Sequence, residues 1–111
     1  MTQQTTTEAL AEDVSQAPAK VRVTVYAKPS GCQPCKATMR KLDKEGIPFN
    51  KILVHDEEKT LIDELKREAT LLGVTGELPC VVVYDASTED THTWFGYQPT
   101  EIMKLKERLQ P

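Results

Sequence analysis

A pair of cysteines at the junction between an alternating apolar run and a helical pattern constrains the fold of this chain more than any other feature. The run VRVTVYA, residues 21–27, places a valine at every second position, which is the period of a β-strand. Residues 28–31 interrupt it, and from Cys32 apolar residues recur at spacings of three and four until Gly46. The sequence therefore predicts a strand–turn–helix unit with Cys32 and Cys35 at the start of the helix.

The next stretch predicts a second strand and a second helix. FNKILV, residues 49–54, follows Pro48 and has the composition of a strand. Residues 55–73 begin with acidic side chains, which we assign to the first helical turn, and end at Gly73. One apolar stripe runs along this helix, made of Leu61, Ile62, Leu65, Ala69 and Leu72.

The last third of the chain predicts a hairpin and a final helix. CVVVYD, residues 80–85, is a nearly continuous apolar strand, ASTED is a turn, and THTWFGY, residues 91–97, is the returning strand. Pro99 stands near the start of the closing helical pattern. The order β-α-β-α-β-β-α predicts an α/β fold with a four-stranded mixed sheet, a right-handed parallel crossover and helices on both faces.

Composition narrows the class of protein. Residues 1–19 are rich in Thr and Gln and poor in large apolar groups, so we expect a flexible tail ahead of one domain at 20–111. That tail has no leader-like pattern, and no stretch is long and apolar enough to span a membrane. With 14 basic and 17 acidic residues and no basic block, nucleic-acid binding is not expected. Three cysteines are too few for a disulfide-stapled secreted scaffold, which favours a reducing cytoplasm.

In such an α/β unit the Cys-x-x-Cys motif indicates thioredoxin-like redox chemistry. A helix N-terminus favours a thiolate, so Cys32 is predicted to be the exposed, attacking thiol. Cys35, one turn inside, is predicted to be more buried and to resolve the mixed disulfide. Lys28 would add positive charge beside the pair, and Pro34 suits a first helical turn.

Other readings of these residues stay open at this point. A zinc site needs four ligands, and beyond the pair the chain offers Cys80, His55 and His92 without a second close-spaced pair. Pro79 stands at the start of the buried strand and has two interpretations. It is either an ordinary loop proline, or it follows a cis peptide bond that exposes the backbone groups of Leu78. An inert pair of buried cysteines is the remaining alternative.

With these residues in view, the chain resembles the thioredoxin/glutaredoxin superfamily, and within it the NrdH redoxins. Those are glutaredoxin-like proteins that thioredoxin reductase recharges and that reduce class Ib ribonucleotide reductase. The likeness covers residues 21–109 and is carried by VTVYAKP…CQPCKATMRKLDKEGI, LPCVVV and WFGYQPTEIMKL. Ser30 and Gly31 lengthen the loop before Cys32 by one residue relative to that family, which alters the reach of Lys28.

The resemblance implies a role for each matching residue. Cys32 would be the nucleophile, Cys35 the resolving thiol and Pro79 a cis-proline facing them. The residues predicted to bind substrate or partner are Lys28, Gln33, Pro34, Leu78, Pro79, Trp94, Gly96 and Tyr97.

The electron donor and the client follow from the same resemblance. WFGYQP replaces the Gly-Gly pair of glutathione-binding glutaredoxins, which favours thioredoxin reductase as the donor and ribonucleotide reductase as the client. We expect a monomeric electron carrier that needs no cofactor or metal. The alternatives are a glutathione-dependent glutaredoxin and a thiol-ligated metal module, such as an iron–sulfur cluster shared between two chains.

Cys80 has no counterpart in the family pattern. Because free cysteine is among the most often buried residue types, we expect Cys80 to be a small residue of the core. A second hypothesis, motivated by its position next to Pro79, is that it lies close enough to Cys35 to exchange disulfides.

Overall fold

The computed structural model of the chain describes residues 20–109 and contains the predicted elements in the predicted order. The predicted tail, residues 1–19, lies outside the described residues. The elements are β2 (Val21–Ala27), α1 (Gln33–Lys44), β3 (Asn50–Leu53), α2 (Lys59–Leu72), β4 (Cys80–Asp85), β5 (Asp90–Phe95) and α3 (Pro99–Leu109).

The four strands form one mixed sheet in the order β3-β2-β4-β5. β3 pairs with β2 in parallel, because the chain crosses over through α1 between them. β4 pairs antiparallel with β2, and β5 returns antiparallel to β4 through a short turn. In this register Val25 lies opposite Val81, and Val81 lies opposite Trp94, so large apolar side chains meet across the sheet. The predicted thioredoxin-like fold is therefore confirmed.

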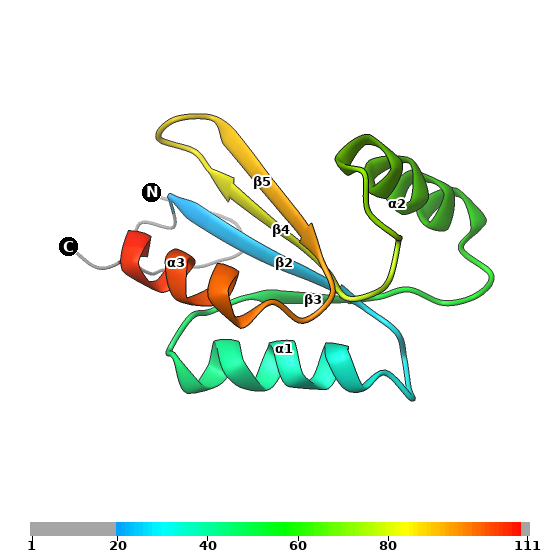
Figure 1. Ribbon diagram of the computed structural model, residues 1–111, viewed down its shortest axis with the longest axis horizontal. Coiled ribbons are helices and arrows are strands. Elements are labelled where there is room, and N and C mark those ends of the chain that lie inside the picture. The colour runs from blue at the N-terminus through cyan, green and yellow to red at the C-terminus, as the bar shows by residue number, and fades with distance from the viewer. Residues whose placement is uncertain (1–19, 110–111) are drawn as a thin grey trace, which may run out of the picture.

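The main core lies on the face of the sheet that α1 and α3 cover (Figure 1). Alternate residues of β2 and β4 point into it, as the period of two requires. Leu42 of α1 and Ile102 of α3 are fully buried against them. This packing holds the start of α1, with its two cysteines, at the end of β2.

The opposite face carries a smaller core cluster of Ala69, Cys80 and Phe95. α2 lies near one end of the sheet (Figure 1), and Ala69 is its one fully buried residue. The predicted apolar stripe is therefore only partly correct, because Leu72 remains 46% exposed. Placing acidic residues in the first turn of this helix was wrong, since residues 56–58 precede α2 and Glu58 caps it without a side-chain hydrogen bond.

Buried or half-buried carboxylates tie α3 to the rest of the fold. Glu45, just after α1, accepts from Lys106 of α3 at 2.7 Å and pairs with Lys41 at 3.0 Å. Asp85, at the end of β4, pairs with Arg108 of α3 at 3.0 Å and accepts hydrogen bonds from Ser87. Both contacts are made by the last turn of α3, so they fix that end of the helix against the end of α1 and the end of β4.

The Glu45 contacts make stability depend on pH. Hydrogen bonds from Lys106 and Lys41 lower the pKa of Glu45 from 4.5 to about 2. Because the folded pKa is depressed, the stabilisation is complete above pH 4.5 and is lost as the pH falls from there toward about 2. We expect denaturant unfolding of a Glu45→Gln variant to show a smaller loss of stability over this range than the wild type. An unchanged acid profile, matching that of an exposed-site Glu107→Gln control, would contradict the assignment.

Candidate active site

The two cysteines lie where the chain leaves β2 and enters α1. Gly31 adopts a left-handed φ of 70°, which turns the chain before the helix and is strained for any residue with a Cβ. Cys32 is extended and serves as the N-cap of α1, and Pro34 occupies the first turn. Cys32 and Cys35 form a disulfide with their Cα atoms 5.3 Å apart.

The helix cap stabilises charge on the Cys32 sulfur. The backbone N–H of Cys35 donates to Cys32 Sγ over 3.2 Å, so the sulfur occupies the position of a capping oxygen. The first N–H groups of a helix lack partners within the helix and carry partial positive charge. A thiolate at Cys32 is therefore favoured once the disulfide is reduced.

Cys32 is more buried than the sequence predicted, whereas Cys35 is buried as predicted. Cys32 is 7% exposed and Cys35 is 1% exposed. The prediction of an exposed Cys32 was therefore wrong, because Cys32 belongs to the main core cluster, against which Leu78 packs. Cys32 is nevertheless the more accessible of the pair, and it lines a cleft.

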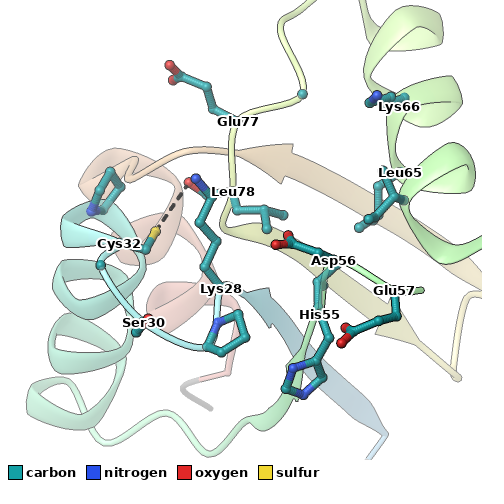
Figure 2. Close-up of a pocket in the computed structure, with 16 residues that line it drawn as sticks. Lys28, Ser30, Cys32, His55, Asp56, Glu57, Leu65, Lys66, Glu77 and Leu78 are labelled. Carbon is teal, nitrogen blue, oxygen red and sulfur yellow. Dashed lines mark hydrogen bonds between the residues drawn. The ribbon is translucent and has the colours of Figure 1, made fainter. Parts of the chain in front are cut away.

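That cleft has a volume of about 930 Å³ and opens beside Cys32 (Figure 2). Its walls are the loop 28–31 with the start of α1, the segment 54–57 after β3, the inner side of α2, and the loop 76–78. Lys28 extends along the Cys32 side of the cleft, and it makes no ion pair with any residue between 20 and 109. The volume of the cleft lies within the ordinary range of ligand-binding clefts.

The loop before β4 completes the site. The Leu78–Pro79 peptide bond is cis, and Pro79 is buried. The carbonyl oxygen of Leu78 lies 3.8 Å from Cys32 Sγ, as the dashed line in Figure 2 marks. On the other side, Gly96 N–H donates to the carbonyl oxygen of Pro79 at 2.8 Å, which links this loop to the segment after β5.

The structure brings together part of the predicted binding set. Lys28, Pro34 and Leu78 line the cleft with Cys32. Gly96, which donates to Pro79, and Tyr97, which is 41% exposed, lie outside the lining residues. Gln33 is exposed on α1 outside the lining residues.

Trp94 requires a correction. The prediction placed it among partner-binding residues, yet only 4% of its surface is exposed and it packs in the main core with Cys35. Because β5 is antiparallel to β4, alternate residues of its end turn inward, and Trp94 is one of them. Its side chain therefore supports the site from beneath.

The wall opposite Cys32 was missed in the sequence. Asp56 and Glu57 were assigned to the first turn of a helix, and His55 was considered as a possible zinc ligand. All three are exposed, and they line the cleft together with Leu65 and Lys66 of α2. A signal was available, because parallel strands β2 and β3 end at the same edge of the sheet. Loops following such strands meet at that edge, where ligands bind in open α/β folds.

Cys80 is separated from the redox pair by the sheet. It lies in the cluster with Ala69 and Phe95, whereas Cys35 belongs to the core on the other face. Burial raises the pKa of Cys80 to about 12, with a smaller contribution from the charge of Glu68. The hypothesis that Cys80 exchanges disulfides with Cys35 was therefore wrong.

The burial of Cys80 predicts its chemical reactivity. At pH 8 the thiol is protonated and covered, so we expect iodoacetamide to leave Cys80 unmodified in the oxidised native protein. Peptide mass mapping after unfolding in denaturant should show complete modification of the same residue. Modification at comparable rates before and after unfolding would contradict its placement.

Two further observations bear on other kinds of site. Within residues 20–109, no group of three or more His, Cys, Asp or Glu side chains is arranged to hold a metal ion. Among the helices of that same part of the chain, none has the length and apolar character needed to cross a membrane.

Comparison with known proteins identifies the relatives of this site. The NrdH-redoxin of Escherichia coli, described as a glutaredoxin-like protein with a thioredoxin-like activity profile, is 28% identical. That match covers 81% of this chain and 96% of that one, with a TM-score of 0.51. The glutaredoxin grx-1 of Archaeoglobus fulgidus is 23% identical. That match covers 87% of this chain and 98% of that one, with a TM-score of 0.55, and it supports the fold.

Sequence comparison gives the family. No curated protein sequence matches the chain significantly. The Glutaredoxin family matches over residues 23–85, which is more than half of the chain and includes β2, the cysteine pair, α2 and β4. Together with the disulfide at the start of α1, this match shows that the chain is a thiol–disulfide oxidoreductase and belongs to the glutaredoxin family.

Proposed function

We propose that the protein is a dithiol protein-disulfide reductase and electron carrier, reduced by thioredoxin reductase and donating electrons to ribonucleotide reductase. The observation that carries this proposal is the Cys32 sulfur, which caps α1 at the edge of an open cleft and lies 3.8 Å from the Leu78 carbonyl. Similarity to a redoxin with a thioredoxin-like activity profile supports it.

The first step is attack on the client by Cys32. Its thiolate, held by the N–H of Cys35, attacks one sulfur of the client disulfide. A bond forms between Cys32 and that client sulfur, the client S–S bond breaks, and the second client sulfur leaves and takes a proton. The extended client backbone would lie along the cleft beside Leu78.

The second step is resolution by Cys35. Its sulfur attacks Cys32 Sγ, forming the Cys32–Cys35 disulfide and releasing the first client sulfur, which leaves as a thiol. The pair has then lost two electrons and the client has gained them. The Cα separation of 5.3 Å lies within the ordinary range for a disulfide, so closing the bond needs no large movement of α1.

Recharging the pair reverses this exchange with a reductase. The segment 94–99, WFGYQP, lacks the Gly-Gly pair that glutathione-binding glutaredoxins carry, and Tyr97 projects there with 41% of its surface exposed. We therefore propose a protein reductase as the electron source, and the nicotinamide and flavin belong to that reductase. The protein itself works without a bound cofactor.

NADPH consumption during reduction of a disulfide substrate tests the proposal. Thioredoxin reductase is compared with glutathione plus glutathione reductase, using the wild type and Cys32→Ser. We expect turnover with thioredoxin reductase and none with the variant, because serine cannot form the mixed disulfide. Oxidised ribonucleotide reductase then replaces the generic substrate.

The two electron sources distinguish the alternatives. Turnover with glutathione alone would place the protein among glutathione-dependent glutaredoxins. Absence of turnover with both sources would reject the reductase function.

A further inference from the structure

A buried hydroxyl on α1 has no hydrogen-bond partner while the disulfide is closed. Thr38 is 0% exposed, and its Oγ1 contacts no donor or acceptor at hydrogen-bond distance within the described part of the chain. Leaving a buried hydroxyl unpaired is unfavourable, because the group gives up its hydrogen bonds to water and gains none in the protein. A buried polar group without a hydrogen-bond partner needs an explanation, and one explanation is that it gains a partner in another state of the protein.

The lack of a partner is not a general property of threonine in these helices. Thr70 of α2 donates its hydroxyl to the carbonyl oxygen of Lys66, four residues earlier, at 3.0 Å. Thr38 stands in the same relation to Pro34 but forms no such bond. Its hydroxyl is therefore uncommitted.

The position of Thr38 directs it toward the resolving sulfur. Cys35, Thr38 and Leu42 form the buried side of α1. Residues three apart on a helix are neighbours, and helical side chains lean toward the N-terminus. The Thr38 side chain thus lies over the turn that carries Cys35.

The chemistry at Cys35 needs such a donor. In the resolving step negative charge develops on a sulfur that is 1% exposed, where water cannot solvate it. The buried polar side chains among residues 20–109 are Thr38 and Asp85. Asp85 lies at the far end of β4, bound to Ser87 and Arg108. Two buried, unpaired donors therefore lie on the Cys35 side, the Thr38 hydroxyl and the Trp94 Nε1–H, and Thr38 is the one on the same helix as Cys35.

We propose that, once the disulfide opens, the Thr38 hydroxyl rotates and donates to Cys35 Sγ, stabilising the developing Cys35 thiolate for resolution. Thr38 keeps its proton, and the proton of Cys35 passes to the departing client sulfur as the Cys32–Cys35 bond forms. The inference rests on the proposed function, because it assigns Cys35 the resolving step. The Thr38 hydroxyl thus has a hydrogen-bond partner, Cys35 Sγ, in the reduced protein only.

Redox equilibrium with dithiothreitol at fixed pH tests the inference without any reductase. Thr38→Val removes the hydroxyl at nearly constant volume, Thr38→Ser retains it, and Thr70→Val is the matched control on α2. We expect Thr38→Val to shift the equilibrium toward the disulfide by roughly fivefold, or about 20 mV, since the hydrogen bond from the Thr38 hydroxyl to Cys35 Sγ is lost from the reduced form alone. Thr38→Ser and Thr70→Val should stay within about twofold of the wild type on the same argument.

A second measurement separates this role from packing. Denaturant unfolding of the oxidised Thr38→Val protein should show undiminished stability, because no hydrogen bond is lost from that form. Equal destabilisation of the oxidised and reduced forms, with an unchanged equilibrium, would overturn the inference. If Thr38→Val does not fold, Thr38→Ala must show the same shift for the inference to stand.

Trp94 provides an internal comparison. Its Nε1 is also buried and unpaired in the core that contains Cys35. A shift in Trp94→Phe without one in Thr38→Val would overturn the assignment to Thr38. A wild-type pair that does not exchange with dithiothreitol at all would reject the proposed function and this inference together.

Discussion

A Cys35→Ser variant is expected to stop as a covalent complex with its client. Cys32 still caps α1 and attacks, but the sulfur that would release the client, with its Cα 5.3 Å away, is gone. Turnover should fall to the uncatalysed background while a mixed disulfide accumulates. Non-reducing electrophoresis and intact mass measurement detect this complex, and dithiothreitol should dissolve it.

Two further variants test whether the complex depends on the roles assigned to the cysteines. Cys32→Ser should give neither turnover nor complex, because the attacking sulfur is absent. Cys80→Ala should retain turnover, since Cys80 lies on the other face of the sheet. Trapping by Cys32→Ser, with Cys35→Ser inert, would reverse the roles assigned to the two cysteines.

Leu42→Ala is expected to cause the largest loss of stability among the substitutions considered. Leu42 is fully buried on α1 in the main core, and removing its side chain leaves a cavity between α1 and the sheet. Substitutions of this kind cost about 2–5 kcal/mol in free energy of unfolding. Urea or guanidinium unfolding, followed by circular dichroism, measures the change.

Leu71→Ala is the matched control for the core substitution. Leu71 belongs to α2 and is 75% exposed, so its truncation should change the free energy of unfolding by less than about 0.5 kcal/mol. Equal effects of the two substitutions would show that α1 does not pack on the sheet as described.

The elements and the position of the redox pair could be predicted because they depend on local patterns. Valine alternation in β2 and the turn at Gly31 act over a few residues each. The cis bond before Pro79 followed from family resemblance, because local composition left both isomers open.

Long-range packing explains what the sequence did not reveal. The apolar stripe of α2 identified the apolar side of the helix, yet only Ala69 is fully buried. Helix periodicity shows which side is apolar and not how much sheet lies beneath it. The cleft depends on where α2 lies relative to the loop 28–31, and no short motif encodes that distance. Trp94 appeared to be a surface residue because the register of β5 determines which way its side chain points.

The sheet separates the Cys32–Cys35 pair from the third cysteine, Cys80, and this determines which disulfides the folded chain can form. A protein with three mutually accessible sulfurs could close three different disulfides and leave any one of the three thiols unpaired. Here the third sulfur, Cys80, is held on the other side of β4 as a protonated thiol, so oxidation of the folded chain yields one product. Thiol–disulfide exchange by the folded chain is therefore confined to the Cys32–Cys35 pair, and the third thiol takes no part in it.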